Sequence, residues 1–358
     1  MNARPPWLER ARDFSDRFGG EIPLLLAPMA GACPPELSIA VMRAGGWGAA
    51  GALLMPPEEI AHWCSTVRAA VEGPFQVNLW IPEADAPIDA DVIAAQATFL
   101  RNWTDEVGDP SATGGPDFAE QFDALIEAAP AAISSIMGVY PPDYVARMKE
   151  AGIPWFATAT TLDEARRAES AGADVIVAQG AEAGGHRGSF DPAASERDQC
   201  GLFALLPAIV DAVDLPVVAT GGIADARGAA AAFMLGASAV QIGTGFLRTD
   251  ESDAAAAWKD ALAVAQPGDT MLTRAYTGRC GRALATRYAM ASAEPGAPAP
   301  APHPLQRGMT KPMTRKAKAG NDISRMQAWA GQSARLAPGG AAADAARTIW
   351  RETRDLIG

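Results

Sequence analysis

The sequence is poor in cysteine and histidine, and its charge balance is strongly acidic. The four cysteines lie far apart without a C-x-x-C pair, so neither a zinc cluster nor a disulfide framework is indicated. A net charge of −12 disfavours a nucleic-acid partner, because an acidic surface repels phosphate backbones. The densest basic run, residues 311–318, is interpreted as a solvated face, and a position beside an anionic ligand is the alternative.

We expect neither a signal peptide nor a membrane span. Residues 1–20 mix acidic and basic side chains and have no apolar core. Residues 228–247 carry no charge and approach the length of a membrane span, but Gly236, Ser238 and Gln241 interrupt them. They predict one buried helix followed by one buried strand. Together with the isolated thiols, these features predict a cytoplasmic protein without a membrane partner.

Short apolar runs recur along the chain and alternate with helical stretches. The runs are continuously hydrophobic, which is typical of parallel strands covered on both faces. Eight such runs predict an α/β fold and favour a closed (β/α)₈ TIM barrel over an open sheet. The expected strands are residues 23–29, 47–50, 75–79, 132–137, 154–159, 175–179, 217–220 and 239–242.

Two of the expected βα units repeat each other. Each has an aspartate near the start of its helix, Asp163 or Asp225, where a carboxylate can cap free N–H groups. Each has a glycine, Gly172 or Gly236, where that helix should end. A repeated unit favours a regular barrel, and we expect a single domain over residues 1–358.

Two regions do not follow this alternation of strands and helices. Residues 82–130 separate the third and fourth strands and predict an insertion that contains extra helix. Residues 291–358 predict a loop and a C-terminal helical extension, with a helix over residues 322–337. The loop, residues 291–304, is rich in Ala and Pro; it either covers a site or only connects surface elements.

Active sites of such barrels lie at the C-terminal ends of the strands. Ala27, Pro28 and Met29 end the first strand among small residues that let a flat ligand approach the backbone. Asn78 and Gln179 end the third and sixth strands. Their amides can bond to the edge of a pyrimidine-like ring, or they can cap a loop instead.

Glycine-rich loops follow the seventh and eighth strands, where barrels commonly hold phosphate. Gly221 and Gly222 follow one strand, and Gly243 and Thr244 follow the other. Glycines expose backbone N–H groups to an anion, and a following helix N-terminus adds a favourable field. The two loops together predict a phosphate site.

His186 lies in the glycine-rich loop of residues 179–188, directly after a buried strand. A neutral imidazole can take a proton near pH 7, so we interpret His186 as a general base, with a tether for the loop as the alternative. Arg187 could attract an anionic substrate or form a surface salt bridge. His62 is interpreted as structural and His303 as solvated.

Several catalytic motifs are absent. There is no G-x-S-x-G elbow, no P-loop and no helix-opening G-x-G-x-x-G. No lysine stands at an expected strand end, which argues against a Schiff-base aldolase. Carboxylates and histidines do not cluster as metal ligands. A phosphate site without hydrolytic or metal-binding residues indicates that a cofactor supplies the reactivity.

Segments in the same order along most of the chain resemble the nitronate monooxygenases, formerly called 2-nitropropane dioxygenases. Any single segment would be weak evidence, but the ordered set is specific. The segments are APMAG at 27–31, AGGWG at 44–48, PFQVN at 74–78, EAGGHRG at 182–188, ATGGI at 219–223, GASAVQIGT at 236–244, TGR at 277–279 and WAGQ at 329–332.

The resemblance implies a TIM barrel that holds FMN without a covalent bond. His186 matches the catalytic histidine of the family. Asn78 and Gln179 would bond to the cofactor, and Gly222 would bind its phosphate. The cofactor contacts that carry over by position are Ala27, Pro28, Met29, Asn78, Gln179, Gly184, Gly221, Gly222, Gln241, Ile242, Gly243 and Thr244.

The resemblance also implies the reaction, in which O₂ oxidises an alkyl nitronate to a carbonyl compound and nitrite. The expected partners are a nitronate or nitroalkane and O₂, and a homodimer stays open. Cys280 and Gly281 depart from the family pattern and leave the local loop shape open. Related barrels with a Gly-Gly-His loop are NAD(P)H-dependent reductases of quinones or enoyl thioesters, which is the main alternative. A flavin- or phosphate-binding protein without turnover is the third.

Overall fold

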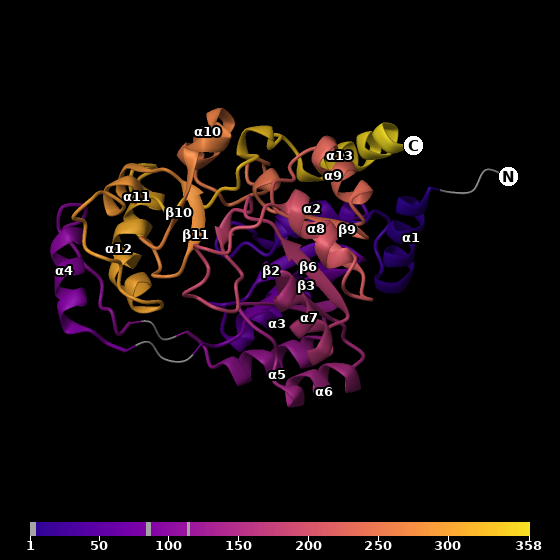
Figure 1. Cartoon of the computed structure of the whole chain (residues 1–358), viewed down its shortest axis with the longest axis horizontal. Helices are drawn as coiled ribbons and strands as arrows, with labels where there is room; N and C mark the ends of the chain where they lie inside the picture. Colours follow the sequence, from indigo (N-terminus) through magenta and orange to yellow (C-terminus); the bar gives the residue numbers. More distant parts are fainter. Residues whose placement is uncertain (1–4, 84–86, 113–114) are drawn as a thin grey trace.

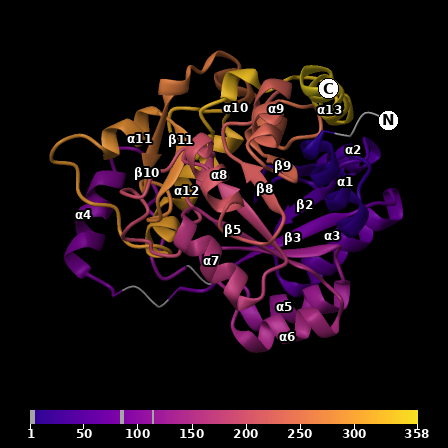
Figure 2. The same ribbon diagram turned by 45° about the vertical axis from the view of Figure 1, so that its right-hand side comes forward.

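Eight parallel strands close into a barrel in the computed structural model, which describes residues 5–83, 87–112 and 115–358 (Figure 2). Neighbouring strands follow the order β1-β9-β8-β6-β5-β4-β3-β2, and a parallel bridge between Leu25 and Trp47 joins β1 to the start of β2. All eight expected strands are confirmed. They are β1 (Leu24–Leu26), β2 (Gly48–Gly51), β3 (Phe75–Trp80), β4 (Ala132–Ile136), β5 (Trp155–Ala159), β6 (Val175–Gln179), β8 (Val217–Thr220) and β9 (Ala239–Ile242).

Helices cover the outside of the barrel, and local signals fix where they begin and end. Asp225 caps α9 as expected, whereas Thr161 caps α7 and Asp163 lies in the first turn of that helix. Gly172 ends α7 at a φ of 100°, which favours glycine. The covering helices are α2 (Pro35–Arg43), α3 (Pro57–Ala70), α5 (Phe118–Ala128), α6 (Pro142–Glu150), α7 (Leu162–Ala171), α8 (Leu202–Val210), α9 (Ala226–Met234) and α13 (Ala342–Ile357).

An aromatic cluster fills the N-terminal end of the barrel. Helix α1 (Pro6–Phe18) supplies Phe14, whose ring centroid lies 6.2 Å from that of Trp47 and 6.1 Å from that of Phe156. Phe18 adds an edge-to-face contact with Phe156 at 5.3 Å. These rings pack on inward-facing strand residues such as Val218, so this end is a packed core.

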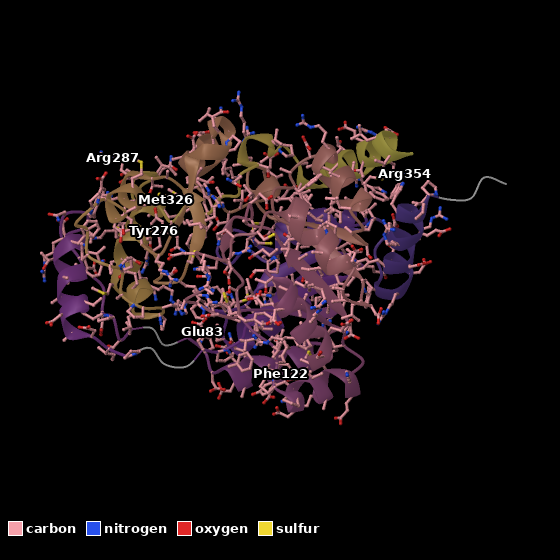
Figure 3. All side chains as sticks on the ribbon, viewed as in Figure 1. Glu83, Phe122, Tyr276, Arg287, Met326 and Arg354 are labelled. Carbon is pink, nitrogen blue, oxygen red and sulfur yellow. The ribbon has the colours of Figure 1, made fainter. Side chains whose placement is uncertain are left out.

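A second lobe lies beside the barrel and is built mostly from late segments of the chain (Figure 1). The antiparallel sheet in this lobe joins β10 (Thr270–Thr273), β11 (Gly281–Leu284) and β7 (Gly185–His186). Tyr276, labelled on the lobe in Figure 3, is buried in the core of the lobe together with Leu100 from α4. The lobe helices are α4 (Ala90–Leu100), α10 (Ala256–Val264), α11 (Arg287–Ser292) and α12 (Leu305–Ala319); short 3₁₀ turns occur at η1 (Thr244–Phe246), η2 (Pro267–Asp269) and η3 (Ala334–Leu336).

The two regions outside the alternation of strands and helices each contribute to both the lobe and the barrel. Residues 82–130 contain α4, which joins the lobe, and α5, which covers the barrel. Gln96 of α4 donates to Pro298 O at 2.7 Å and thereby ties α4 to the Ala/Pro-rich loop. The extension after residue 304 supplies α12 to the lobe and α13 to the barrel, where α13 packs against α9 and α2. The single-domain organisation stays a prediction.

The helix expected over residues 322–337 is wrong. The only helical part is the short η3, and the rest of the segment consists of turns, irregular structure and an isolated bridge at Trp329. Ala330 N–H donates to Arg282 O at 3.2 Å, and Gln332 N–H donates to Glu182 O at 3.0 Å. These groups bond to other segments, so they cannot form the i to i−4 bonds of a helix.

The uncharged segment 228–247 folds as expected into most of α9 followed by β9. Within the described parts of the chain, no helix has the length and apolar character needed to cross a membrane.

Candidate active site

A cavity of about 780 Å³ opens at the C-terminal ends of the barrel strands. This is within the size range of cofactor and substrate sites in proteins. Its lining comes from the strand ends, the β7 loop, α12 and the segment that contains Trp329. The barrel and the lobe therefore share one site. Of the residues proposed from sequence, those that line it are Ala27, Pro28, Met29, Asn78, Gln179, Gly184, His186, Gly221, Gly222, Gln241, Gly243 and Thr244.

Ile242 is the one proposed contact that does not line the cavity. Its side chain is fully buried in the core between the barrel and its helices. Its carbonyl accepts from Ala27 N–H at 2.9 Å, so Ile242 fixes the backbone of a residue that does line the cavity. Alternation along β9 explains this placement, because the adjacent Gln241 then points into the barrel.

Side-chain amides gather where the cavity meets the barrel. Gln76 donates to Gln241 Oε1 at 2.8 Å and to Leu26 O at 3.2 Å. The Oε1 atom of Gln76 is buried and has no partner among the described atoms. Asn78 donates to Ser134 Oγ at 3.1 Å. Since Gln76 lines the cavity, an N–H on the edge of a bound ring would satisfy the unpaired acceptor.

Part of the cavity wall is rich in glycine and suits a phosphate group. Gly221 and Gly222 have φ values of 109° and 72°, a left-handed backbone that favours glycine. A Cβ atom on Gly184 would lie 2.5 Å from Gly331 N, so only glycine allows this close approach. Thr244 Oγ1 accepts from Gly331 N–H at 3.0 Å and joins the two loops. Successive N–H groups of this kind can bind an anion.

Gln179 and Arg187 hold the histidine loop in place. Gln179 donates to His186 O at 3.2 Å and accepts from Gly188 N–H at 2.8 Å. These bonds agree with the alternative interpretation of Gln179, in which its amide caps a loop. Arg187 is 4% exposed and donates to the carbonyls of Gln179 at 2.6 Å and Thr160 at 3.2 Å. Among the described residues, Arg187 neither lines the cavity nor forms a surface salt bridge, so neither role suggested for it agrees with its position.

His186 lies between two indole rings. Its ring centroid is 4.7 Å from that of Trp80 and 4.7 Å from that of Trp329. The Nε2 atom lies 2.9 Å from Thr277 Oγ1. Burial lowers the pKa of His186 to about 3, and the nearby His303 and Arg307 add to that effect. His186 is therefore a neutral imidazole at ordinary pH, and a neutral imidazole can accept a proton.

The interpretations of the other two histidines need correction. His303 was expected to be solvated, but it lines the cavity, and its ring centroid lies 5.5 Å from that of Trp80. Burial, with Arg307 and Arg279 nearby, lowers the pKa of His303 to about 4. His62 is exposed on α3, whereas the adjacent Trp63 is buried. His62 therefore has no packing role in the core.

One face of α12 brings positive charge to the cavity. Arg307, Lys311, Arg315 and Lys318 line it at helical spacing, and Glu59 is the only carboxylate among the described lining residues. The solvated interpretation of residues 311–318 is therefore only partly right. Lys316, on another face, pairs with Glu106 at 3.5 Å. The site has a cationic side in an acidic protein.

Sequence reasoning missed most of the lobe's contribution to this cavity. The helical spacing of the basic residues on α12 was a usable signal, whereas nothing in the sequence placed Thr277 or His303 next to His186. The lining residues that were missed are Gln76, Trp80, Ser134, Thr158, Thr277, His303, Arg307 and Trp329. Lys311, Arg315 and Lys318 belong to the run 311–318, for which a position beside an anionic ligand was the alternative interpretation.

Comparison with known proteins agrees with this geometry. The sequence profile of the family described as nitronate monooxygenase matches residues 14–348. Nitronate monooxygenase from Paraburkholderia phytofirmans is 36% identical over 347 residues, which cover 95% of this chain and 94% of the relative. The chain belongs to the nitronate monooxygenase family. Nitronate monooxygenase from Pseudomonas aeruginosa is 37% identical over 360 residues, which cover 95% of this chain and all of the relative.

Solved structures similar to this nitronate monooxygenase family member share its fold. Nitroalkane oxidase from Streptomyces ansochromogenes has a TM-score of 0.87 and 35% identity, covering 95% of this chain and 98% of the other. FabK from Thermotoga maritima has a TM-score of 0.75 and 28% identity, covering 96% of each chain. Family membership makes the protein an enzyme, a flavin-dependent oxidoreductase of the class that oxidises nitronates.

Proposed function

We propose that the protein catalyses the FMN-dependent oxidation of alkyl nitronates by O₂ to a carbonyl compound and nitrite. The observation that carries this proposal is His186, a neutral imidazole between two indole rings in a cavity with a cationic side. A neutral base suits a nitroalkane, and the cationic side attracts the nitronate anion. For the natural substrate we propose only the chemical class, which is a small nitronate or nitroalkane.

The lining residues fit FMN. Backbone N–H groups around Gly222 and Thr244 would hold the phosphate, supported by the field at the start of α9. The unpaired Oε1 of Gln76, with Asn78 and Gln241, would bond to the polar edge of the ring. When bound, FMN supplies the electron acceptor for oxidation of the substrate. Denaturing release of the cofactor and its mass would identify it.

His186 acts on the proton that distinguishes a nitroalkane from a nitronate. It takes the proton from the carbon beside the nitro group, and the C–H electron pair moves into the nitro group to leave the nitronate anion. A preformed nitronate has already lost this proton. His186 is thus needed for the first substrate much more than for the second.

A reductase on the same barrel is the second candidate, favoured by the similarity to FabK over 96% of each chain. It would use NAD(P)H to reduce a quinone or an enoyl thioester through FMN. Oxygen uptake and nitrite release by the purified protein, with propionate 3-nitronate alone, support the oxygenase. Bleaching of the flavin by NADH without any nitronate response would replace the proposal with the reductase. Bound flavin with neither response would indicate a binding protein.

His186→Asn tests the role of the histidine. We expect turnover of neutral nitroethane to fall by about 10²–10⁴, the usual contribution of a general base. Turnover of preformed ethyl nitronate should change much less. The matched control is His62→Asn, which alters an exposed histidine on α3 and should leave both rates unchanged. Equal losses on both substrates in His186→Asn would contradict the assignment of a base.

A further inference from the structure

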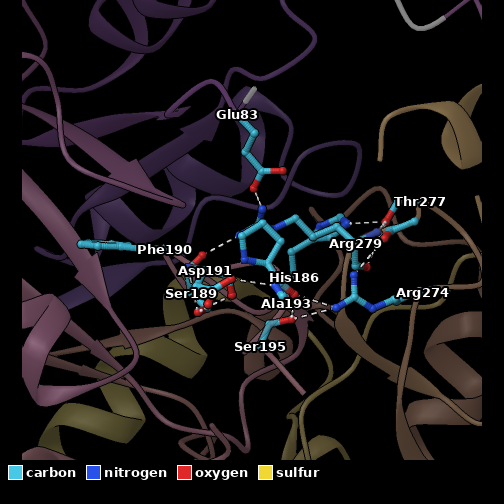
Figure 4. Close-up of polar contacts among 12 residues, drawn as sticks. Glu83, His186, Ser189, Phe190, Asp191, Ala193, Ser195, Arg274, Thr277 and Arg279 are labelled. Atoms are coloured by element: carbon cyan, nitrogen blue, oxygen red, sulfur yellow. Dashed lines mark hydrogen bonds and ion pairs between the residues drawn. The ribbon is translucent and has the colours of Figure 1, made fainter. Parts of the chain in front are cut away.

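The hydroxyl of Thr277 lies close to three polar groups that belong to His186 and Arg279, and Figure 4 labels these three residues. Thr277 Oγ1 lies 2.9 Å from His186 Nε2, 3.2 Å from Arg279 O and 3.3 Å from Arg279 N. Thr277 is 2% exposed and Arg279 is 1% exposed. These three groups are therefore the partners that decide where the hydroxyl proton points.

Only one proton arrangement gives each of these groups a partner. A threonine hydroxyl has a single proton to donate. If this proton points to Arg279 O, the hydroxyl accepts from Arg279 N–H, and His186 must donate from Nε2–H. If it points to His186 Nε2 instead, the carbonyl of Arg279 loses the only donor described for it. An unpaired buried carbonyl is unfavourable, so the first arrangement is preferred.

The other nitrogen of His186 has a different environment. No described group bonds to Nδ1, yet this atom is not sealed in the interior, and the ring lines the cavity. We propose that Thr277 is a positioning residue that holds His186 as its Nε2–H tautomer, so that Nδ1 accepts the substrate proton. The proposal rests on the proposed role of His186 as a base. After the transfer, Nε2–H still donates to Thr277, so the contact survives both protonation states.

The backbone keeps Thr277 and His186 at this distance although they are 91 residues apart in the sequence. Gly281 of β11 pairs directly with His186 of β7. A Cβ atom on Gly281 would lie 2.9 Å from Gly185 O and 3.1 Å from His186 Cα. Arg187 N–H donates to Cys280 O at 2.9 Å and extends the connection. The segment that departs from the family pattern at Cys280 and Gly281 therefore holds the two residues together.

Thr277→Val removes the hydroxyl and keeps the side-chain shape. We expect kcat/KM with nitroethane to fall about 10- to 100-fold, the loss usual when a hydrogen-bond partner that orients a metal-bound histidine is removed. Preformed ethyl nitronate should react within about twofold of the wild-type rate, because no proton is removed. Thr277→Ser keeps the hydroxyl and should restore most of the nitroethane activity. Thr353→Val is the matched control, since Thr353 is a fully buried threonine of α13 that donates to Ile349 O in α13 and to Ala226 O in α9.

The tautomer is measured directly on the FMN-loaded protein by NMR after labelling histidine with ¹⁵N. The His186 signals are those lost in His186→Asn. A proton on Nε2 in the wild type, and its partial loss in Thr277→Val, support the proposal. A proton on Nδ1 in the wild type overturns it, as does wild-type nitroethane activity in Thr277→Val. The wild-type spectrum decides even if that variant fails to fold. Equal losses with nitroethane and ethyl nitronate in His186→Asn would instead overturn the proposed function of His186 as a base. The two results are distinguishable because the NMR spectrum does not depend on turnover.

Discussion

Replacing Gly278 by Ala perturbs the turn that carries Thr277. Gly278 has a φ of 81°, and its Cβ would lie 2.3 Å from Ala301 O, 2.5 Å from His303 N and 2.6 Å from Pro302 C. These are backbone atoms, so they cannot move aside as a flexible side chain can. Gly152 is the matched control, because it has a φ of 67° but no atom within 4 Å of its Cβ position. Comparing the two alanine variants separates steric overlap from backbone conformation.

Both variants carry the left-handed backbone cost of roughly 1 kcal/mol for a residue with a Cβ. Gly278→Ala adds overpacking of about 1–3 kcal/mol, because a backbone segment must shift to admit the new atom. With an unfolding entropy of about 2.1 cal/mol/K per residue over 358 residues, each kcal/mol corresponds to about 1.3 °C in Tm. The expected losses are therefore about 3–5 °C for Gly278→Ala and about 1 °C for Gly152→Ala.

Thermal unfolding of the flavin-loaded protein, followed by circular dichroism, measures both losses. The Gly278 variant should also lose kcat/KM with nitroethane, because the shifted turn moves Thr277 away from His186. The Gly152 variant should keep that activity. Equal changes in Tm for the two variants would refute the steric reasoning, since they share only the backbone term.

Two further predictions concern charge. Since burial, His303 and Arg307 lower the pKa of His186 to about 3, His186 stays unprotonated as the pH falls from about 8 to about 5, and kcat/KM with nitroethane should not fall over that range. A tenfold loss per pH unit that begins near pH 6.5 in this profile would contradict the lowered pKa. Lys311→Met should raise KM for propionate 3-nitronate about three- to tenfold at low salt, and added salt should reduce the difference. Lys316→Met, which alters a lysine outside the cavity, should change KM by less than about twofold.

Strand positions were readable in the sequence because a barrel strand is covered on both faces. Its continuous apolar run differs from the surrounding loops and helices, and the run ends where the chain meets the cavity. The segment 322–337 shows the limit of such local signals. Its composition permits a helix, but its backbone bonds to Arg282 and Glu182 instead. Tertiary hydrogen bonds outweighed a weak local preference there.

In the site, too, some features follow from local sequence signals and others depend on tertiary contacts. His186, Asn78 and the glycines follow strands, so the barrel topology alone predicts that they meet at one end. Arg187 adjoins His186 in the sequence but points away from the cavity, because its guanidinium reaches carbonyls in the interior. His303 belongs to a segment more than 100 residues later, and its proximity to Trp80 depends on how the lobe packs on the barrel.

The sequence by itself determined the strands, the glycine loops, the acidic balance and the candidate base, since each follows from residue types within one short segment. Only the tertiary structure decided which side chains surround that base, how far its pKa falls and which of its nitrogens faces Thr277. Those properties depend on burial and on distances between segments far apart in the chain, and local residue patterns contain neither.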